Sequence, residues 1–146
     1  NTCAVHFRGG DFHSWNPDAI LKYEYYHNSI EDIKDKVSNF VLFTDDTNLD
    51  SYKQTKKYLE NKNINYSIGV NSSNRSNYID DFSFMSECDW MISSPSTFCI
   101  SAGAIGRKKN IIHSKDWIQN RINNNDKFWV DLNSGGNSSY SVWKYF

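Results

Sequence analysis

The stretch CAVHFRGGD, residues 3–11, decides the fold. Its first five residues are apolar except for one histidine. This pattern predicts a buried strand over 3–7 that ends abruptly at Arg8-Gly9-Gly10-Asp11. Similar short apolar runs recur along the chain, and between them lie segments whose apolar residues are three or four positions apart, which is helical spacing. Strands that alternate with helices imply right-handed crossovers and a mostly parallel sheet.

The same patterns place the remaining elements. Pro17 suits the start of a helix, and the inward-facing helical stripes include Tyr23 and Ile79. The end of the chain is weakly specified, although Trp129 and Trp143 can dock it. We therefore predict an α/β fold, a Rossmann-like parallel sheet with flanking helices, in one domain spanning 1–146. Further strands are predicted at 40–44, 65–70, 90–93 and 109–113, and helices at 20–37, 49–59, 78–88 and 96–105.

Composition excludes several classes of protein. The net charge is -1 and basic residues form no stripe, so no nucleic-acid partner is expected. Three cysteines without C-x-x-C spacing favour buried thiols in a reducing, cytoplasmic compartment over disulfides or zinc. No apolar run reaches the roughly 18–20 residues of a membrane helix. The sequence enters a strand at once and has no initiating methionine, so we expect a domain cut from a longer protein.

Candidate binding groups follow the predicted strands, where open parallel sheets bind ligands. Arg8, beside two glycines, can present its planar guanidinium to a pyrophosphate, and Asp11 can hold the loop or orient the arginine. An ordinary surface ion pair is the alternative. His6 alternates with Val5 and Phe7, and a satisfied core histidine is equally consistent with that pattern.

The segment 93–98, Ser-Ser-Pro-Ser-Thr-Phe, joins a predicted strand to a predicted helix. Hydroxyl and N–H groups at a helix N-terminus can bind an anion, although an ordinary N-cap would look the same. Asp80 and Asp81 can recognise the donor edge of a guanine or form a solvated helix face. The sequence contains no P-loop, no G-x-G-x-x-G and no G-x-S-x-G. Asp45 and Asp46 lack the D-x-D spacing of a metal-dependent transferase.

Read together, these segments resemble the fucosyltransferase superfamily of α-1,2-, α-1,6- and protein O-fucosyltransferases. The H-x-R-x-x-D motif matches residues 6–11, and a strand that ends in a hydroxyl residue and two aspartates matches 43–46. The α-1,2-type runs D-x-x-L-M-S-x-C and I-S-N-S-T-F resemble 81–89 and 92–98. The resemblance covers roughly residues 3–117 and departs from the family pattern at Gly9, where many α-1,2 enzymes have a second arginine.

The resemblance implies a fold and a reaction. The chain would correspond to the C-terminal, donor-binding half of a GT-B glycosyltransferase that transfers fucose from GDP-fucose to a glycan hydroxyl. Transfer would invert the anomeric centre, with no cofactor and no metal ion. The partners would be the nucleotide-sugar donor and a glycan acceptor. An N-terminal acceptor domain would be missing, could bring a peripheral membrane context, and would leave this chain inactive alone.

The resemblance also implies residue roles. Arg8 would contact the diphosphate and be the catalytic residue, and Asp11 would stabilise its loop. His6 and Asp81 would recognise the nucleoside, while Ser96 and the two residues after it would hold phosphate. Two alternatives stay open, a non-catalytic nucleotide- or sugar-binding module and a transferase for another nucleotide sugar. The complete predicted donor site is His6, Arg8, Asp11, Asp81, Ser96, Thr97 and Phe98.

Overall fold

The computed structural model describes residues 1–69, 78–106, 110–114 and 143–145. Its sheet has six strands in the order β3-β2-β1-β4-β5-β6, and every strand runs parallel to its neighbours. This order is that of the Rossmann-like α/β fold, so the predicted fold class is confirmed. The strands are β1 (Thr2–Phe7), β2 (Asn39–Thr44), β3 (Tyr66–Ile68), β4 (Trp90–Ile92), β5 (Asn110–His113) and β6 (Trp143–Tyr145).

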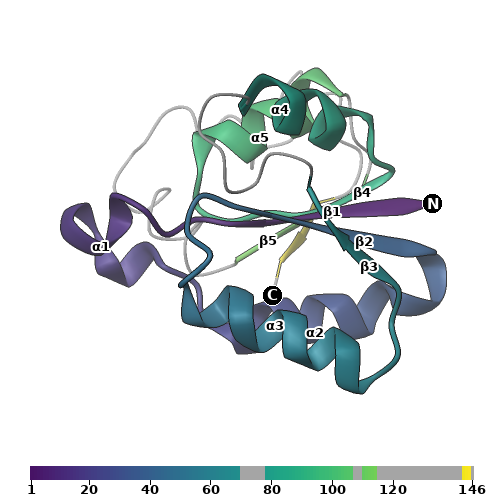
Figure 1. The fold of residues 1–146 in the computed structure, drawn as a ribbon. Coiled ribbons are helices and arrows are strands. Elements are labelled where there is room, and N and C mark those ends of the chain that lie inside the picture. Colours follow the sequence, from purple (N-terminus) through teal and green to yellow (C-terminus); the bar gives the residue numbers. More distant parts are fainter. Residues whose placement is uncertain (70–77, 107–109, 115–142, 146) are drawn as a thin grey trace.

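Helices cover both faces of this sheet (Figure 1). One layer consists of α2 and α3, and the opposite layer consists of α4 and α5. The short helix α1 lies at the end of the sheet where β1 terminates. The helices are α1 (Phe12–Trp15), α2 (Tyr23–Ile33), α3 (Asp50–Asn61), α4 (Tyr78–Glu87) and α5 (Thr97–Ile105), with 3-10 turns η1 (Pro17–Ala19) and η2 (Lys34–Lys36).

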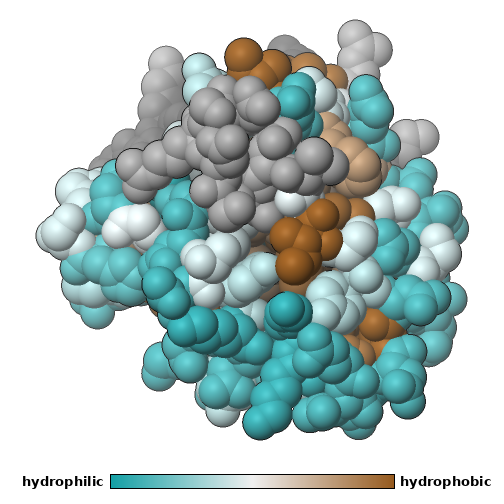
Figure 2. Space-filling model, in the orientation of Figure 1, coloured by the Kyte–Doolittle hydropathy of each residue, from teal (hydrophilic) through white to brown (hydrophobic). Residues whose placement is uncertain are grey.

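Each helical layer buries its own apolar cluster against the sheet. Along β1, Cys3, Val5 and Phe7 face the α2–α3 layer, while Ala4 faces the α4–α5 layer, as the two-residue period of a strand requires. Phe7 packs against Tyr26 of α2 with ring centroids 4.2 Å apart. Because both faces are covered, the central strands have no polar side, which explains their continuous apolar runs. The outer surface over α2 and α3 is mostly hydrophilic (Figure 2).

Several elements differ from their predicted bounds. The helix predicted over 20–37 is α2, flanked by 3-10 turns. Tyr23 is exposed, so its predicted inward position is wrong, and its ring packs on His27 of the same helix. Ile79 is also exposed, so its predicted inward position is wrong, and Met85 is the fully buried member of that stripe. Helix α1 and strand β6 were not predicted, although Trp143 begins β6.

Other predictions hold or fall outside the described ranges. All three cysteines are buried thiols, as predicted. The strand predicted over 65–70 is β3, and its last predicted residue lies outside the described residues, as does Trp129. Helix α5 begins directly after Ser96, so the predicted helix start is confirmed.

Candidate functional site

The carboxyl ends of β1 and β4 define the place where the strand order reverses. From β1 the chain moves outward through β2 to β3, then crosses back to β4 on the other side of β1. The β1–β4 ladder ends at the pair Val5 and Ile92, and the segments 6–11 and 93–96 follow it directly. Ligands of open α/β sheets bind in the crevice outside such a reversal. The predicted donor-binding segments therefore lie where this fold places its ligands.

Arg8 is held by two carboxylates from different segments. Its guanidinium donates to Asp11 in the next turn and to Asp45 at the end of β2. It also lies over the ring of Phe12, 5.1 Å from the centroid. The side chains of Arg8 and Asp45 are 28% and 20% exposed, whereas that of Asp11 is 67% exposed. The positive charge of Arg8 is therefore balanced by two carboxylates. That of Asp45 is mostly buried, and that of Asp11 is mostly in solvent.

Asp45 and Asp46 belong to this site, although neither was among the predicted donor-binding residues. Asp45 Oδ1 accepts the main-chain N–H of Gly9 at 2.9 Å, so one carboxylate binds both the arginine and its loop. Asp46 accepts the N–H of Asn48 at 2.9 Å and contacts the ring of His13, 3.1 Å away on α1. The signal in the sequence was their position directly after β2, because β2 neighbours β1 at the same edge.

His6 bridges the ends of β1 and β4 on the side of α4 and α5. Its Nδ1 lies 2.7 Å from the hydroxyl oxygen of Ser94, within hydrogen-bond distance. Burial, together with the smaller effect of the Arg8 positive charge, lowers the pKa of His6 to about 3, so the imidazole is neutral at pH 7. Both residues are buried, and the described contacts of His6 include no carboxylate. This Ser–His pair therefore connects the ends of the two strands and, within the part of the chain described, lacks the third group that would orient the histidine to activate a serine nucleophile.

The first turn of α5 carries the other predicted phosphate ligands. Ser96 is the residue before the helix, and its hydroxyl makes no capping bond within the described residues. Its N–H donates to the Ser94 carbonyl at 2.7 Å. Thr97 is exposed and Phe98 is half-buried. The first N–H groups of an α-helix lack partners within the helix, so this turn can offer donors to a ligand bound beside it.

Aromatic rings connect this turn to α4. The Phe98 ring lies 6.0 Å from that of His6 and packs edge-on against Phe82, with centroids 5.4 Å apart. Asp81 directly precedes Phe82 in the first turn of α4 and is half-buried. The structure thus brings Phe98 of α5 and Phe82 of α4 together beside His6, whereas Arg8 is held by Asp11 and Asp45.

A second buried polar group supports the ends of β4 and β5. The Ser93 hydroxyl is hydrogen-bonded to His113 Nδ1, and the Tyr25 hydroxyl of α2 lies 2.8 Å from the Ser93 carbonyl oxygen. Burial lowers the pKa of His113 to about 3. Sequence reasoning missed this pair, and its signal was a polar residue at the end of each of two neighbouring apolar strands. Consecutive serines 93 and 94 thus tie β4 to both adjacent strands.

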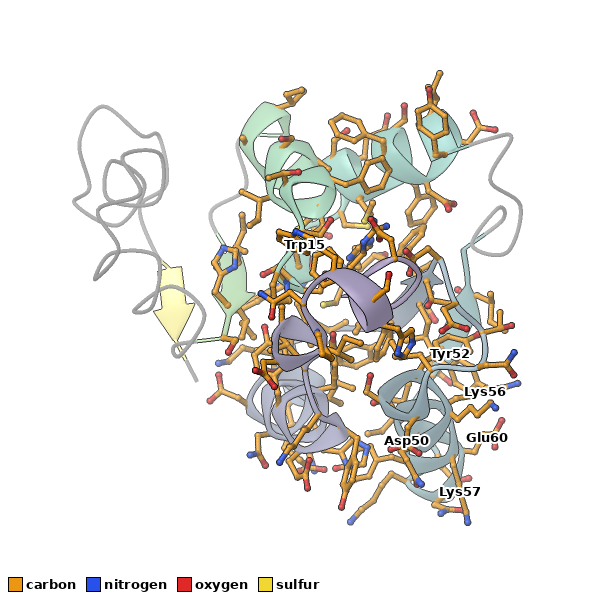
Figure 3. All side chains as sticks on the ribbon, turned by 90° about the vertical axis from the view of Figure 1, so that its left-hand side faces the viewer. Trp15, Asp50, Tyr52, Lys56, Lys57 and Glu60 are labelled. Carbon is orange, nitrogen blue, oxygen red and sulfur yellow. The ribbon has the colours of Figure 1, made fainter. Side chains whose placement is uncertain are left out.

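Helix α1 closes this end of the molecule. Figure 3 looks onto it and labels Trp15 at the same end, together with Lys56, Lys57 and Glu60, which extend outward from α3. Trp15 is exposed and packs against Phe12 with ring centroids 5.0 Å apart. The Phe12 ring thus contacts both the Arg8 guanidinium and the Trp15 ring.

No family model, curated protein or solved structure matches this chain. Within the described ranges, histidine, cysteine, aspartate and glutamate form no cluster of three or more that could hold a metal ion. In the same part of the chain, no helix is both long and apolar enough to cross a bilayer. The fold and the crevice define a Rossmann-like α/β domain whose polar groups converge at the strand-order reversal.

Proposed function

We propose that this chain binds GDP-fucose at the β1–β4 crevice and forms the donor half of a GT-B fucosyltransferase. The observation that carries the proposal is the placement of Arg8 and the first turn of α5 on the two strands that flank the reversal. A pyrophosphate needs several donors converging from different directions, and these two segments supply them. The resemblance of 6–11, 43–46 and 81–98 to fucosyltransferase motifs selects GDP-fucose among nucleotide sugars.

The diphosphate would lie between Arg8 and the start of α5. A guanidinium carries five N–H donors, and its bonds to Asp11 and Asp45 leave others for a phosphate oxygen. Asp11 is largely in solvent and can move aside without exposing a buried group. The N–H groups of Thr97 and Phe98 would bind the opposite side of the diphosphate, helped by the helix dipole.

The nucleoside would lie toward α4. Neutral His6 adds no charge there and acts through position, while the Phe98 and Phe82 rings offer an apolar surface for a planar base. Asp81 would accept the N–H donors of a guanine edge, which a uracil does not offer in the same pattern. This division of the crevice predicts that GDP binds better than UDP.

Catalysis would depend on Arg8. As the bond between sugar and phosphate breaks, negative charge grows on the departing diphosphate, and a fixed cation stabilises that charge most in the transition state. Such a reaction needs no metal ion when arginine and helix N–H groups supply the donors. The acceptor hydroxyl and its base would come from a glycan-binding half that the described residues do not include.

A non-catalytic nucleotide-binding module is the second candidate. The observation in its favour is that two carboxylates already balance the Arg8 charge, with Asp46 close to the same loop. An arginine whose charge is balanced by two carboxylates attracts an anion less strongly than an arginine without such partners. Transfer of radioactive fucose from GDP-fucose to a glycan, by the chain together with any acceptor half, would exclude a purely binding role.

Calorimetry on the 146-residue chain tests the donor site directly. With chelator present, GDP should bind saturably and more tightly than UDP. Arg8→Lys should weaken GDP at least about tenfold, because lysine offers one compact charge in place of a fork. Guanosine, which has no phosphate, is the matched ligand and should bind parent and variant equally. Strict dependence of GDP binding on a divalent ion, or equal GDP affinity in Arg8→Lys, would refute the proposed site.

A further inference from the structure

Two carboxylates share the Arg8 guanidinium, and their surroundings differ. Asp11 lies in the turn that follows Arg8 and is 67% exposed, and among the described residues its carboxylate bonds only to that arginine. Asp45 is 20% exposed and comes from a different strand. An exposed ion pair contributes little because water screens it and both side chains stay mobile. Asp45 is therefore the partner that can fix the arginine.

Asp45 also fixes the loop that carries the arginine. Its Oδ1 accepts the Gly9 N–H at 2.9 Å while its Oδ2 binds Arg8. Gly10 has a positive φ of +42°, and a Cβ built there would lie 2.6 Å from Oδ2 of the same carboxylate. The two glycines thus let the loop close onto Asp45, and one side chain determines both the backbone path and the direction of the guanidinium.

We propose that Asp45 is the positioning residue of the diphosphate site: it holds Arg8 ready for the ligand, and Asp11 does not. This inference rests on the proposed function. Asp45 acts on the ligand only through Arg8, because its own negative charge repels a diphosphate. Positioning and repulsion therefore oppose each other, and Arg8 decides which of them prevails.

This opposition makes the effect of losing Asp45 depend on the arginine. With Arg8 present, Asp45→Asn removes a charge-assisted hydrogen bond and frees the guanidinium, so pyrophosphate and GDP should bind about tenfold more weakly. With Arg8→Ala in the background, nothing remains to be positioned. Removing the repelling charge should then leave anion affinity unchanged or raise it.

Calorimetry with GDP and with inorganic pyrophosphate measures this double-mutant cycle. Asp11→Asn is the matched control, because it removes a carboxylate from the same guanidinium, and its effect should stay below about fivefold. Asp45→Glu is the second variant. It keeps the charge, and hence the repulsion, while moving the carboxylate by one methylene, so a loss of affinity in this variant reports position alone.

The ligand-free chain gives an independent readout. In nitrogen-15 spectra the signal of Arg8 Nη1–H, the group that donates to Asp45, should exchange faster with water in Asp45→Asn and Asp45→Glu than in the parent or Asp11→Asn, with thermal melts confirming that each variant is folded. Equal effects of Asp45→Asn with and without Arg8, or a larger effect of Asp11→Asn, would overturn the inference while the donor site stands. If the parent chain binds neither GDP nor pyrophosphate, the proposed function fails and the inference falls with it.

Discussion

The two histidines at the strand ends should make the fold sensitive to mild acid. Burial lowers the pKa of His6 and of His113 to about 3, with the Arg8 charge a further cause for His6, against 6.5 for an ordinary histidine. The unfolded chain therefore takes up protons that the folded chain excludes. Because the unfolded state binds more protons, stability is complete above about pH 6.5 and falls as the pH decreases toward 3.

The magnitude follows from these two values. Between pH 7 and pH 5 an unfolded histidine passes from mostly neutral to almost fully charged, while the folded one stays neutral. Each histidine then costs about 2 kcal/mol of unfolding free energy, and the pair about 4 kcal/mol. A folded pKa of 4 in place of 3 would barely change this figure at pH 5. Domains of this kind have about 5–15 kcal/mol in total, so the loss is large.

Urea unfolding followed by circular dichroism at pH 7, 6 and 5 measures the loss. Most carboxylates remain ionised across this window, so histidines dominate it. His6→Gln and His113→Gln should each remove about half of the loss. Burial also lowers the pKa of His27, although its ring is less deeply buried than those of His6 and His113. An unfolding free energy that is the same at pH 7 and pH 5 would refute the reasoning.

Two further predictions concern contacts around the site: one tests the packing of α5 on α4 and has a control variant, and the other tests a hydrogen bond. Gly106→Ala should destabilise the fold by about 1–3 kcal/mol in urea unfolding, because its Cβ would lie 2.0 Å from the main-chain oxygen of Ser86, which cannot rotate away; a neutral result would mean that α4 and α5 separate easily. Gly103→Ala is its control and should cost less, since its Cβ meets the flexible end of the Ile111 side chain at 2.7 Å. Tyr25→Phe should cost about 1–2 kcal/mol by leaving a strand-end carbonyl without its donor, and a fully stable variant would contradict that role.

The sequence predicted the layered fold well because hydrophobic periodicity reports burial directly. Four of the six strands and α2 through α5 were expected near their observed positions, and β3 was expected with longer bounds. The two missed elements lack a pattern for different reasons. Helix α1 spans four residues, about one turn, which is too short to show a helical period, and β6 lies in the weakly specified end of the sequence. Tyr23 and Ile79 fit an apolar stripe by spacing, yet both lie in the first turn of their helices.

The site was predictable only as a set of segments. Strand ends and a helix start are visible in the sequence, and they led to Arg8 and Ser96. Pairings across strands are not visible, because they depend on strand order. Asp45 reaches Arg8 only because β2 neighbours β1, and Ser94 reaches His6 only because β4 lies on the other side.

The geometry of the crevice follows from where main-chain pairing stops. The β1–β4 ladder ends at Val5 and Ile92, and beyond that point no further β1–β4 register pair ties the two described strands. The next connection is the His6–Ser94 hydrogen bond, made by side chains. On the β2 side the ladder continues to Phe7 and Thr44, so Asp45 is presented directly beside Arg8. The longer pairing with β2 holds the arginine beside that strand, whereas side chains alone continue the connection from β1 to β4. The proposed diphosphate would therefore meet the positioned Arg8 on one side and the first N–H groups of α5 on the other.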